Sequence, residues 1–286
     1  MKHLDLFELD KKIEIMDVGA AAINETPIYS NLINSKIGNL NAFEGDERQI
    51  EKLKLKYKDS IRLFNEFLFD GSDQDLYLAD PASGMTSLFK PNEKVLNFFN
   101  SFSDFGKIEE IKKIKTSKLN DIKKLPLIDF AKLDIQGSEL TVLKNGNLKL
   151  AKCLAIQVEV SYVCLYENQP TFGEIDLWMR ESGYIPHRFM DIKRWSITPT
   201  IFNDNPRVPG NQLLESDIIY IKDPFRTELL DDEQLKKLIL LSHYCFKSYD
   251  LSVFFILELE KRKILKKDIF KNYIANKKFF HNENRK

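Results

Sequence analysis

Four acidic side chains of this sequence lie where an apolar run ends, which is where a predicted strand stops. They are Asp17, Glu44, Asp134 and Glu159. In open α/β sheets, ligands bind beyond the carboxyl ends of the strands, so acids at these ends can gather around one ligand. A carboxylate there can accept hydrogen bonds from hydroxyl groups or act as a general base. The positions of these acids therefore indicate a ligand site at one edge of a sheet.

Asp134 belongs to the segment around which the rest of the chain is organised. The apolar residues between Ile128 and Leu133 predict a buried strand, Gly137 predicts a turn, and residues 139–143 have helical spacing. Asp134 thus stands between a strand and a crossover helix. A charged group in that place must reach water, a partner or a ligand, because burying it alone is costly. A second interpretation stays open, in which Asp134 only caps the following helix.

The first two predicted strands carry a loop and an acid of the kind that nucleotide-like ligands use. Residues 13–18 lead into Gly19 and three alanines, and small residues let a backbone approach a ligand closely. Because only one glycine of a G-x-G-x-x-G pattern is present, an ordinary turn is the alternative. Glu44 ends the second strand, where an acid can bind paired ribose hydroxyls. Its alternative role is a surface carboxylate beside Asp46 and Glu47.

Strands and helices alternate along most of the chain. We expect further strands at residues 61–64 (continued by 65–69), 74–79 and 153–160, a short extended segment at residues 184–189, and a closing hairpin of residues 195–201 and 215–221. Helices are expected at residues 46–58 and 172–179, and the lysine-rich residues 107–124 are expected to form a half-buried strand or helix face rather than a phosphate-binding patch. This order predicts an α/β fold with a doubly wound, mostly parallel sheet and a late antiparallel strand pair.

The character of the sequence changes near residue 226. Residues 229–246 and 251–274 have helical periodicity, so we expect an α/β domain at residues 1–225 and a helical, basic appendage at residues 226–286. The favoured interpretation of the basic tail is a solvated face. Docking to an acidic partner or a membrane surface is the alternative.

Composition narrows the class of protein. Of the 286 residues, 43 are Lys or Arg and 43 are Asp or Glu, so the net charge does not favour a nucleic-acid binder. Cys153, Cys164 and Cys245 lack metal-ligand spacing and are expected to be buried apolar residues in a reducing compartment. No apolar run approaches a membrane span, and acids come too early for a signal peptide. We therefore expect a cytoplasmic protein with no integral membrane segment.

Several motifs together match a known family. They are Asp17-Val18-Gly19-Ala20, Ala42-Phe43-Glu44, the run from Lys132 to Glu139, Ile156–Val160 and Leu165–Gln169. With them, the chain resembles the FkbM-type family of S-adenosylmethionine-dependent methyltransferases over roughly residues 11–223. The resemblance implies a class I, Rossmann-like methyltransferase fold. It also implies methylation of a hydroxyl on a sugar, a polysaccharide or a secondary metabolite, and leaves the oligomeric state open.

The resemblance also assigns residues to the cofactor. Asp17, Gly19 and Ala20 would lie along its methionine part, Glu44 would bind the ribose hydroxyls, Phe67 and Leu68 would lie beside the adenine, and Asp134 would face the reaction centre. Three positions depart from the family pattern. Ala21 replaces an asparagine, Ile23 replaces a glycine, and Gly45 replaces the proline after the ribose acid.

An alcohol acceptor must lose its proton during methyl transfer, so a general base is expected near the methyl group. Asp134 and Glu159 are the main candidates, and His187 is a further one whose alternative is a structural histidine. Tyr162 and Tyr166 are candidates for lining the acceptor site. No cluster of residues demands a metal ion.

Two functions of other classes compete with this prediction. A catalytically inactive cofactor-binding or scaffold module could use the same fold, and the altered glycine loop favours it. The retained acids oppose it. An NAD-dependent oxidoreductase is opposed by the missing glycines and by the absence of a Tyr-x-x-x-Lys pair.

Overall fold

The computed structural model describes residues 7–20, 26–57 and 61–275. Ala21 and Ile23, two of the three departures from the family pattern, lie outside these residues, as do Lys58 and the end of the basic tail. The chain divides into two compact units. The helical unit comprises Met1–Ile13, Thr26–Asn39 and Asp223–Lys286, and the sheet unit comprises Glu14–Glu25 and Leu40–Lys222. The domain boundary predicted after residue 225 stays a prediction.

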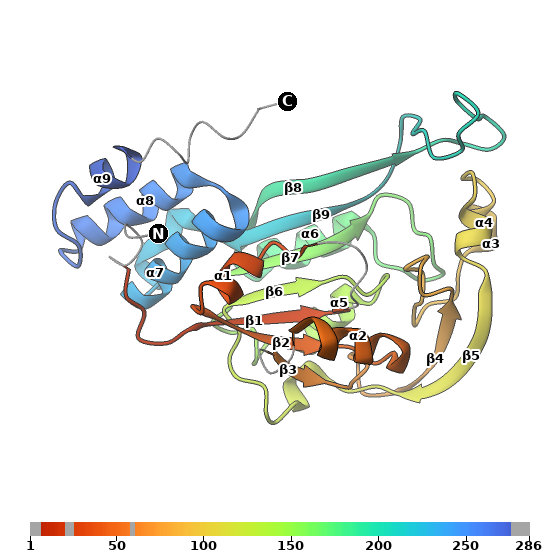
Figure 1. Ribbon diagram of the computed structural model, residues 1–286, viewed down its shortest axis with the longest axis horizontal. Helices are drawn as coiled ribbons and strands as arrows, with labels where there is room; N and C mark the ends of the chain where they lie inside the picture. Colours follow the sequence, from red (N-terminus) through yellow and green to blue (C-terminus); the bar gives the residue numbers. More distant parts are fainter. Residues whose placement is uncertain (1–6, 21–25, 58–60, 276–286) are drawn as a thin grey trace. The chain divides into compact units, whose positions relative to one another are not determined.

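A seven-stranded sheet forms the centre of the fold (Figure 1). In spatial order its strands are β3 (Ile61–Phe64), β2 (Gly38–Phe43), β1 (Ile13–Val18), β6 (Phe130–Leu133), β7 (Ala155–Ser161), β9 (Gln212–Lys222) and β8 (Tyr184–Trp195). The pairs β2–β3, β1–β6 and β6–β7 are parallel, whereas β9 is antiparallel to both β7 and β8. The predicted fold class, an α/β fold with a doubly wound, mostly parallel sheet and a late antiparallel strand pair, is confirmed.

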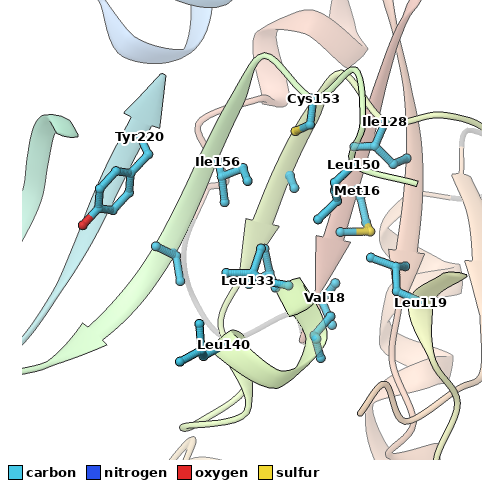
Figure 2. Close-up of a cluster of buried hydrophobic side chains, with 14 of the residues drawn as sticks. Met16, Val18, Leu119, Ile128, Leu133, Leu140, Leu150, Cys153, Ile156 and Tyr220 are labelled. Atoms are coloured by element: carbon cyan, nitrogen blue, oxygen red, sulfur yellow. The ribbon is translucent and has the colours of Figure 1, made fainter. Parts of the chain in front are cut away.

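Helices and apolar side chains pack against the central strands of the sheet. The sequences of these strands are therefore largely apolar. Every residue of β7 is buried, as expected for a parallel strand covered on both faces. Figure 2 shows Val18, Leu133 and Leu140 in the core cluster, with Leu140 coming from α5 (Glu139–Lys144). The helix α6 (Phe172–Glu181) begins with a capping box between Thr171 and Glu174. The helix α2 (Glu47–Tyr57) follows β2 in the chain.

A two-stranded antiparallel sheet is inserted between β3 and β6 in the sequence. It pairs β4 (Asp73–Ala79) with β5 (Ile108–Lys115), and the short helices α3 (Glu93–Leu96) and α4 (Phe102–Phe105) lie between these strands in the chain (Figure 1). The strand predicted at residues 74–79 is confirmed. Most residues of β5 are exposed, because its lysines and glutamates face solvent. The single turn η2 (Leu119–Asp121) follows.

Two predicted strands are wrong in position. Residues 65–69 do not continue β3, because Leu68 instead forms a bridge with Ser117. The closing hairpin starts earlier than predicted, since β8 runs from Tyr184 to Trp195 rather than through residues 195–201. Its interior Pro186 is tolerated because β8 is an edge strand.

The helical unit consists of short and medium helices. They are α1 (Ser30–Asn34), the 3-10 segment η3 (Pro224–Leu229), α7 (Asp232–Leu241), the π-helix η4 (Ser242–Phe246), α8 (Tyr249–Lys261) and α9 (Ile269–Ala275). The helical character predicted for residues 229–246 and 251–274 is confirmed over α7, η4, α8 and α9, whereas residues 262–268, which separate α8 from α9, are not helical. Of the helices described in either unit, none combines the length and the apolar composition that crossing a bilayer requires.

Candidate functional site

The acids singled out by the sequence lie at the carboxyl ends of neighbouring strands. Asp17 is the penultimate residue of β1, Glu44 directly follows β2, Asp134 directly follows β6, and Glu159 lies in the second half of β7. Asp17, Glu44 and Glu159 are all less than 10% exposed. Burying ionisable groups is costly unless they are paired, so each needs a compensating partner.

Lys132 is the cationic partner of Asp134 and also lies near Asp17. It stands opposite Asp17 in the β1–β6 register, and its Nζ lies 3.2 Å from Asp134 Oδ2 and 3.9 Å from Asp17 Oδ1. Burial opposes the charge on Lys132, but the attraction of Asp134, Asp17 and Asp217 outweighs it and raises the pKa of Lys132. Burial likewise opposes the charge on Asp134, yet the field of Lys132 wins and lowers the Asp134 pKa. Asp134 is therefore held in its ionised form.

Glu159 is in the opposite electrostatic situation. Burial, followed by repulsion from Glu215 and Asp134, raises the pKa of Glu159 well above its usual value. Lys193 on β8 opposes this shift weakly, because its Nζ lies 2.6 Å from Glu215 Oε1 but 4.0 Å from Glu159 Oε1. Neighbouring acids with opposite pKa shifts are typical of sites that divide acid and base roles.

Gln136 connects the loop after β6 to the residues around it. Its Nε2 donates to Glu159 Oε2 at 3.0 Å, its Oε1 accepts from the Tyr166 hydroxyl at 2.8 Å, and its carbonyl accepts from the Ser87 hydroxyl at 2.7 Å. Gln136 adopts a positive φ of 54°, and Gly137 follows with a φ of 108°. A non-glycine residue in this backbone region is uncommon and is retained where surrounding contacts hold it. These contacts fix the orientation of the Glu159 carboxyl.

Glu139 stabilises the same loop by hydrogen bonds to its backbone. Its Oε1 accepts hydrogen bonds from the backbone N–H of Ile135 at 2.8 Å and of Gly137 at 3.2 Å. The side chain is 2% exposed, and burial raises its pKa to about 7. Both of these hydrogen bonds are to the loop backbone, so Glu139 has a structural role there.

Gly19 brings the first loop against the Asp134 loop. Its φ is +77°, and a Cβ at this position would lie 2.0 Å from the Asp134 carbonyl oxygen. The Asp134 N–H donates to the Val18 carbonyl at 3.1 Å, and the N–H groups of Gly19 and Ala20 donate to the Phe43 carbonyl. A glycine is thus required here by the packing of the loop on Asp134.

Glu44 is buried directly after β2. Its Oε1 accepts from the Asp46 N–H at 2.8 Å, and burial raises its pKa to about 7, with Asp46 and Asp17 adding repulsion. A Cβ at Gly45 would lie 2.6 Å from the Phe67 ring, which is where the family carries a proline. The ring of Phe67 therefore takes the space that a larger residue 45 would need. Leu68, beside it in the chain, is buried.

Two further candidates from the sequence are His187 and Tyr162. His187 is half-buried on the edge strand β8, two strand spacings or about 10 Å from β7. Its role as a base stays a prediction. Tyr162 packs edge-on against Phe172 with ring centroids 5.7 Å apart. Within residues 7–20, 26–57 and 61–275, no three His, Cys, Asp or Glu side chains are grouped so that they could hold a metal ion.

Sequence reasoning missed Lys132, Gln136 and Lys193. Lys132 and Gln136 lie inside the motif used for the resemblance, and a lysine within a buried strand two residues before an acid could have indicated an ion pair. Lys193 reaches the site only through the pairing of β8 with β9. No local pattern in the sequence reveals that pairing.

The family model for the methyltransferase FkbM domain matches residues 17–186. The chain belongs to the FkbM family of S-adenosylmethionine-dependent methyltransferases. That match contains Asp17, Glu44, Asp134 and Glu159. No curated protein sequence matches the chain.

Solved structures of methyltransferases are similar at low identity. Precorrin-6y C5,15-methyltransferase from Geobacter metallireducens GS-15 is 11% identical, with 78% of this chain and 86% of that chain covered and a TM-score of 0.38. Magnesium protoporphyrin IX methyltransferase from Synechocystis PCC 6803, solved with bound SAM, is 8% identical, with coverage of 74% and 71% and a TM-score of 0.37. The 23S rRNA methyltransferase ErmE is 8% identical, with coverage of 84% and 75% and a TM-score of 0.36. Their names refer to different acceptors.

Proposed function

We propose that this chain transfers a methyl group from S-adenosylmethionine to a hydroxyl of a saccharide or other small molecule. The observation that carries the proposal is the buried polar cluster at the ends of β1, β6 and β7. In it, an ionised Asp134 paired with Lys132 lies near Glu159, whose pKa is raised. An acid that stays charged beside one that can take up a proton suits a reaction in which an alcohol is deprotonated.

The residues present fit the cofactor by the chemistry of their donors. Glu44 offers carboxylate oxygens to the ribose hydroxyls, and hydrogen bonds to a charged acceptor are stronger than neutral ones. Asp17 and Asp134 supply more negative charge than Lys132 neutralises, which suits a ligand that carries a positive charge. When bound, S-adenosylmethionine supplies a methyl group already activated on a sulfonium.

The chain's own task is to orient the acceptor and move its proton. Glu159 Oε2 accepts from Gln136, which leaves Oε1 to take the proton of the acceptor hydroxyl. With the cofactor bound, the oxygen of that hydroxyl would accept the methyl group, and the carbon–sulfur bond would be the one broken in the same displacement. Asp134, kept ionised by Lys132, keeps negative charge beside this centre, and fixed positions for both groups supply part of the rate enhancement.

Glu159→Gln tests this assignment. The amide keeps the shape of the side chain but cannot take a proton, so we expect kcat to fall by at least about a hundredfold. Methyl transfer from labelled S-adenosylmethionine is measured with a panel of saccharides, hydroxylated aromatics and nucleosides. The affinity for S-adenosylhomocysteine should be unchanged.

Transfer to nitrogen or carbon atoms, or an unchanged kcat in Glu159→Gln, would contradict the proposal. The wild-type rate should also rise with pH as Glu159 loses its proton, since the fold favours the protonated form. The inactive-scaffold alternative rests on Ala21 and Ile23, which lie outside the described residues, so no structural observation favours it.

A further inference from the structure

A cavity of about 420 Å³ lies in the sheet unit. Its walls include Asp80, Ser83, Asp104, Phe105, Trp195 and Arg207. These residues come from three segments: the loop after β4, the helix α4, and the end of β8 with the loop that follows it. The volume is within the range of small-molecule sites. None of these residues belongs to the cofactor or base assignments above.

The walls combine two kinds of surface. Trp195 and Phe105 provide aromatic rings, and the Arg207 guanidinium carbon lies 5.7 Å from the centre of the Phe105 ring. Asp80 and Asp104 add carboxylate acceptors, while Arg207 adds N–H donors. A sugar ring has matching features, because its C–H faces pack on aromatic rings while its hydroxyls both donate and accept hydrogen bonds.

The tryptophan of the wall is held in place before any ligand binds. Its Nε1 donates to the Asn100 carbonyl at 2.8 Å, and its ring meets Phe102 edge-on with centroids 5.1 Å apart. Phe102 is buried in a second apolar cluster of the sheet unit, against which Trp195 packs. A rigid wall reduces the entropy lost on binding.

Two connections link the cavity to the polar cluster. On β8, Trp195 follows Lys193 by two residues, which is about 7 Å along a strand. In the loop after β4, Ser83 accepts from the Met85 N–H, and the Met85 carbonyl lies 3.3 Å from the Tyr166 hydroxyl. Tyr166 in turn donates to Gln136. These contacts link the cavity to Gln136 and Lys193, the two residues that approach Glu159.

We propose that this cavity binds a second sugar residue of an oligosaccharide acceptor whose first residue presents its hydroxyl to Glu159. The inference rests on the proposed function and makes it more specific. An acceptor of at least two linked sugars fills both places, whereas a single sugar fills only one. Affinity for the acceptor should therefore depend on Trp195 and Arg207, although neither residue contacts the reacting atoms.

The test is binding of the full-length protein, with S-adenosylhomocysteine present, to an array of defined mono- to hexasaccharides. We expect the bound members to contain at least two linked sugars. Arg207→Ala and Asp104→Asn, both at exposed positions, should weaken that binding at least tenfold. Arg194→Ala changes a nearby exposed arginine that does not line the cavity and should leave binding unchanged. Trp195→Phe keeps an aromatic wall and should retain part of the affinity.

The outcomes separate the two proposals. Calorimetry with S-adenosylhomocysteine should give the same Kd in wild type, Arg207→Ala and Asp104→Asn. If the wild type does not bind this ligand, the proposed function fails. If it does bind, the second-sugar site is overturned by any of three results: no binding to the array, binding of monosaccharides alone, or binding unaffected by Arg207→Ala. If ATP competes with the saccharides for the cavity lined by Trp195, the cavity is a nucleotide site and the second-sugar proposal is overturned.

Discussion

At the scale of single residues, Lys132 determines how the acids around it divide their roles. Lys132 lies within hydrogen-bonding distance of Asp134 and near Asp17. The lysine beside Glu159 is Lys193, whose Nζ lies 4.0 Å from Glu159 Oε1. Asp134 therefore stays charged while the fold favours a proton on Glu159. Two carboxylates of ordinary chemistry become different reagents because only one of them has a close cation.

Glu44 should make cofactor affinity depend on pH. Burial raises its pKa to about 7 from an ordinary value of 4.5, so the proton is lost as the pH rises through neutrality. Only the carboxylate can accept from both ribose hydroxyls. Binding of S-adenosylhomocysteine, measured by calorimetry, should strengthen up to about tenfold per pH unit below pH 7 and level off above it.

Two variants provide the comparison for this pH dependence. Glu44→Gln does not titrate, so its affinity should be weaker and nearly flat from about pH 6 to about pH 8. Glu47→Gln removes an exposed carboxylate at the start of α2 and should keep the wild-type profile. An identical pH profile in Glu44→Gln would remove Glu44 from the ribose site.

At the scale of elements, the loop from Asp134 to Ser138 depends on Glu139. Glu139→Ala leaves the N–H groups of Ile135 and Gly137 without their acceptor, which we expect to cost roughly 1–3 kcal/mol of unfolding free energy. Glu139→Gln keeps an acceptor oxygen and should cost less. Urea unfolding measures both, and equal losses in the two variants would show that these hydrogen bonds contribute little.

The elements that could be predicted from the sequence are those whose signal is local. The central strands β1, β6 and β7 are apolar runs that end near an acid, so both the strands and the acids were predicted. Residues 184–189 of β8 were predicted to be extended, but its second half was missed because exposed Asp191 and Arg194 interrupt any apolar pattern. Only its long-range pairing with β9 makes this segment a strand.

The same limit applies to the site. The acids could be found because each directly follows or lies near the end of an apolar run, but their pKa values depend on neighbours in other strands. Lys193 and Glu215 meet through the β8–β9 register, and Gln136 meets Tyr166 across 30 residues. The packing at Gly45 could not be predicted from the sequence either, because the ring that a Cβ at this position would meet belongs to Phe67, in another segment.

At the scale of the whole molecule, every residue assigned to the cofactor lies in the sheet unit. The helical unit has its own stabilising centre in Arg262, which donates to the carbonyls of Thr227 and Leu230 and forms ion pairs with Asp232 and Glu258. The two units should therefore respond separately to substitutions.

Arg262→Ala tests that separation. It removes the donors to two carbonyls and two carboxylates, so we expect a loss of about 2–3 kcal/mol in unfolding free energy by urea denaturation. Lys261→Ala, which removes one exposed ion pair to Glu258, should cost at most about 0.5 kcal/mol. Both variants should bind S-adenosylhomocysteine with wild-type affinity while folded, and a weakened affinity in Arg262→Ala would show that the helical unit supports the site.

The central claim is that the acids at the strand ends form an S-adenosylmethionine site. Calorimetric titration with S-adenosylmethionine, S-adenosylhomocysteine and NAD tests it most directly, using wild type and Glu44→Ala. The account predicts micromolar binding of the first two ligands, no binding of NAD, and at least tenfold weaker binding in Glu44→Ala, since the ribose hydroxyls lose their acceptor. Binding of NAD, no binding of either adenosyl ligand, or an unchanged affinity in Glu44→Ala would contradict it.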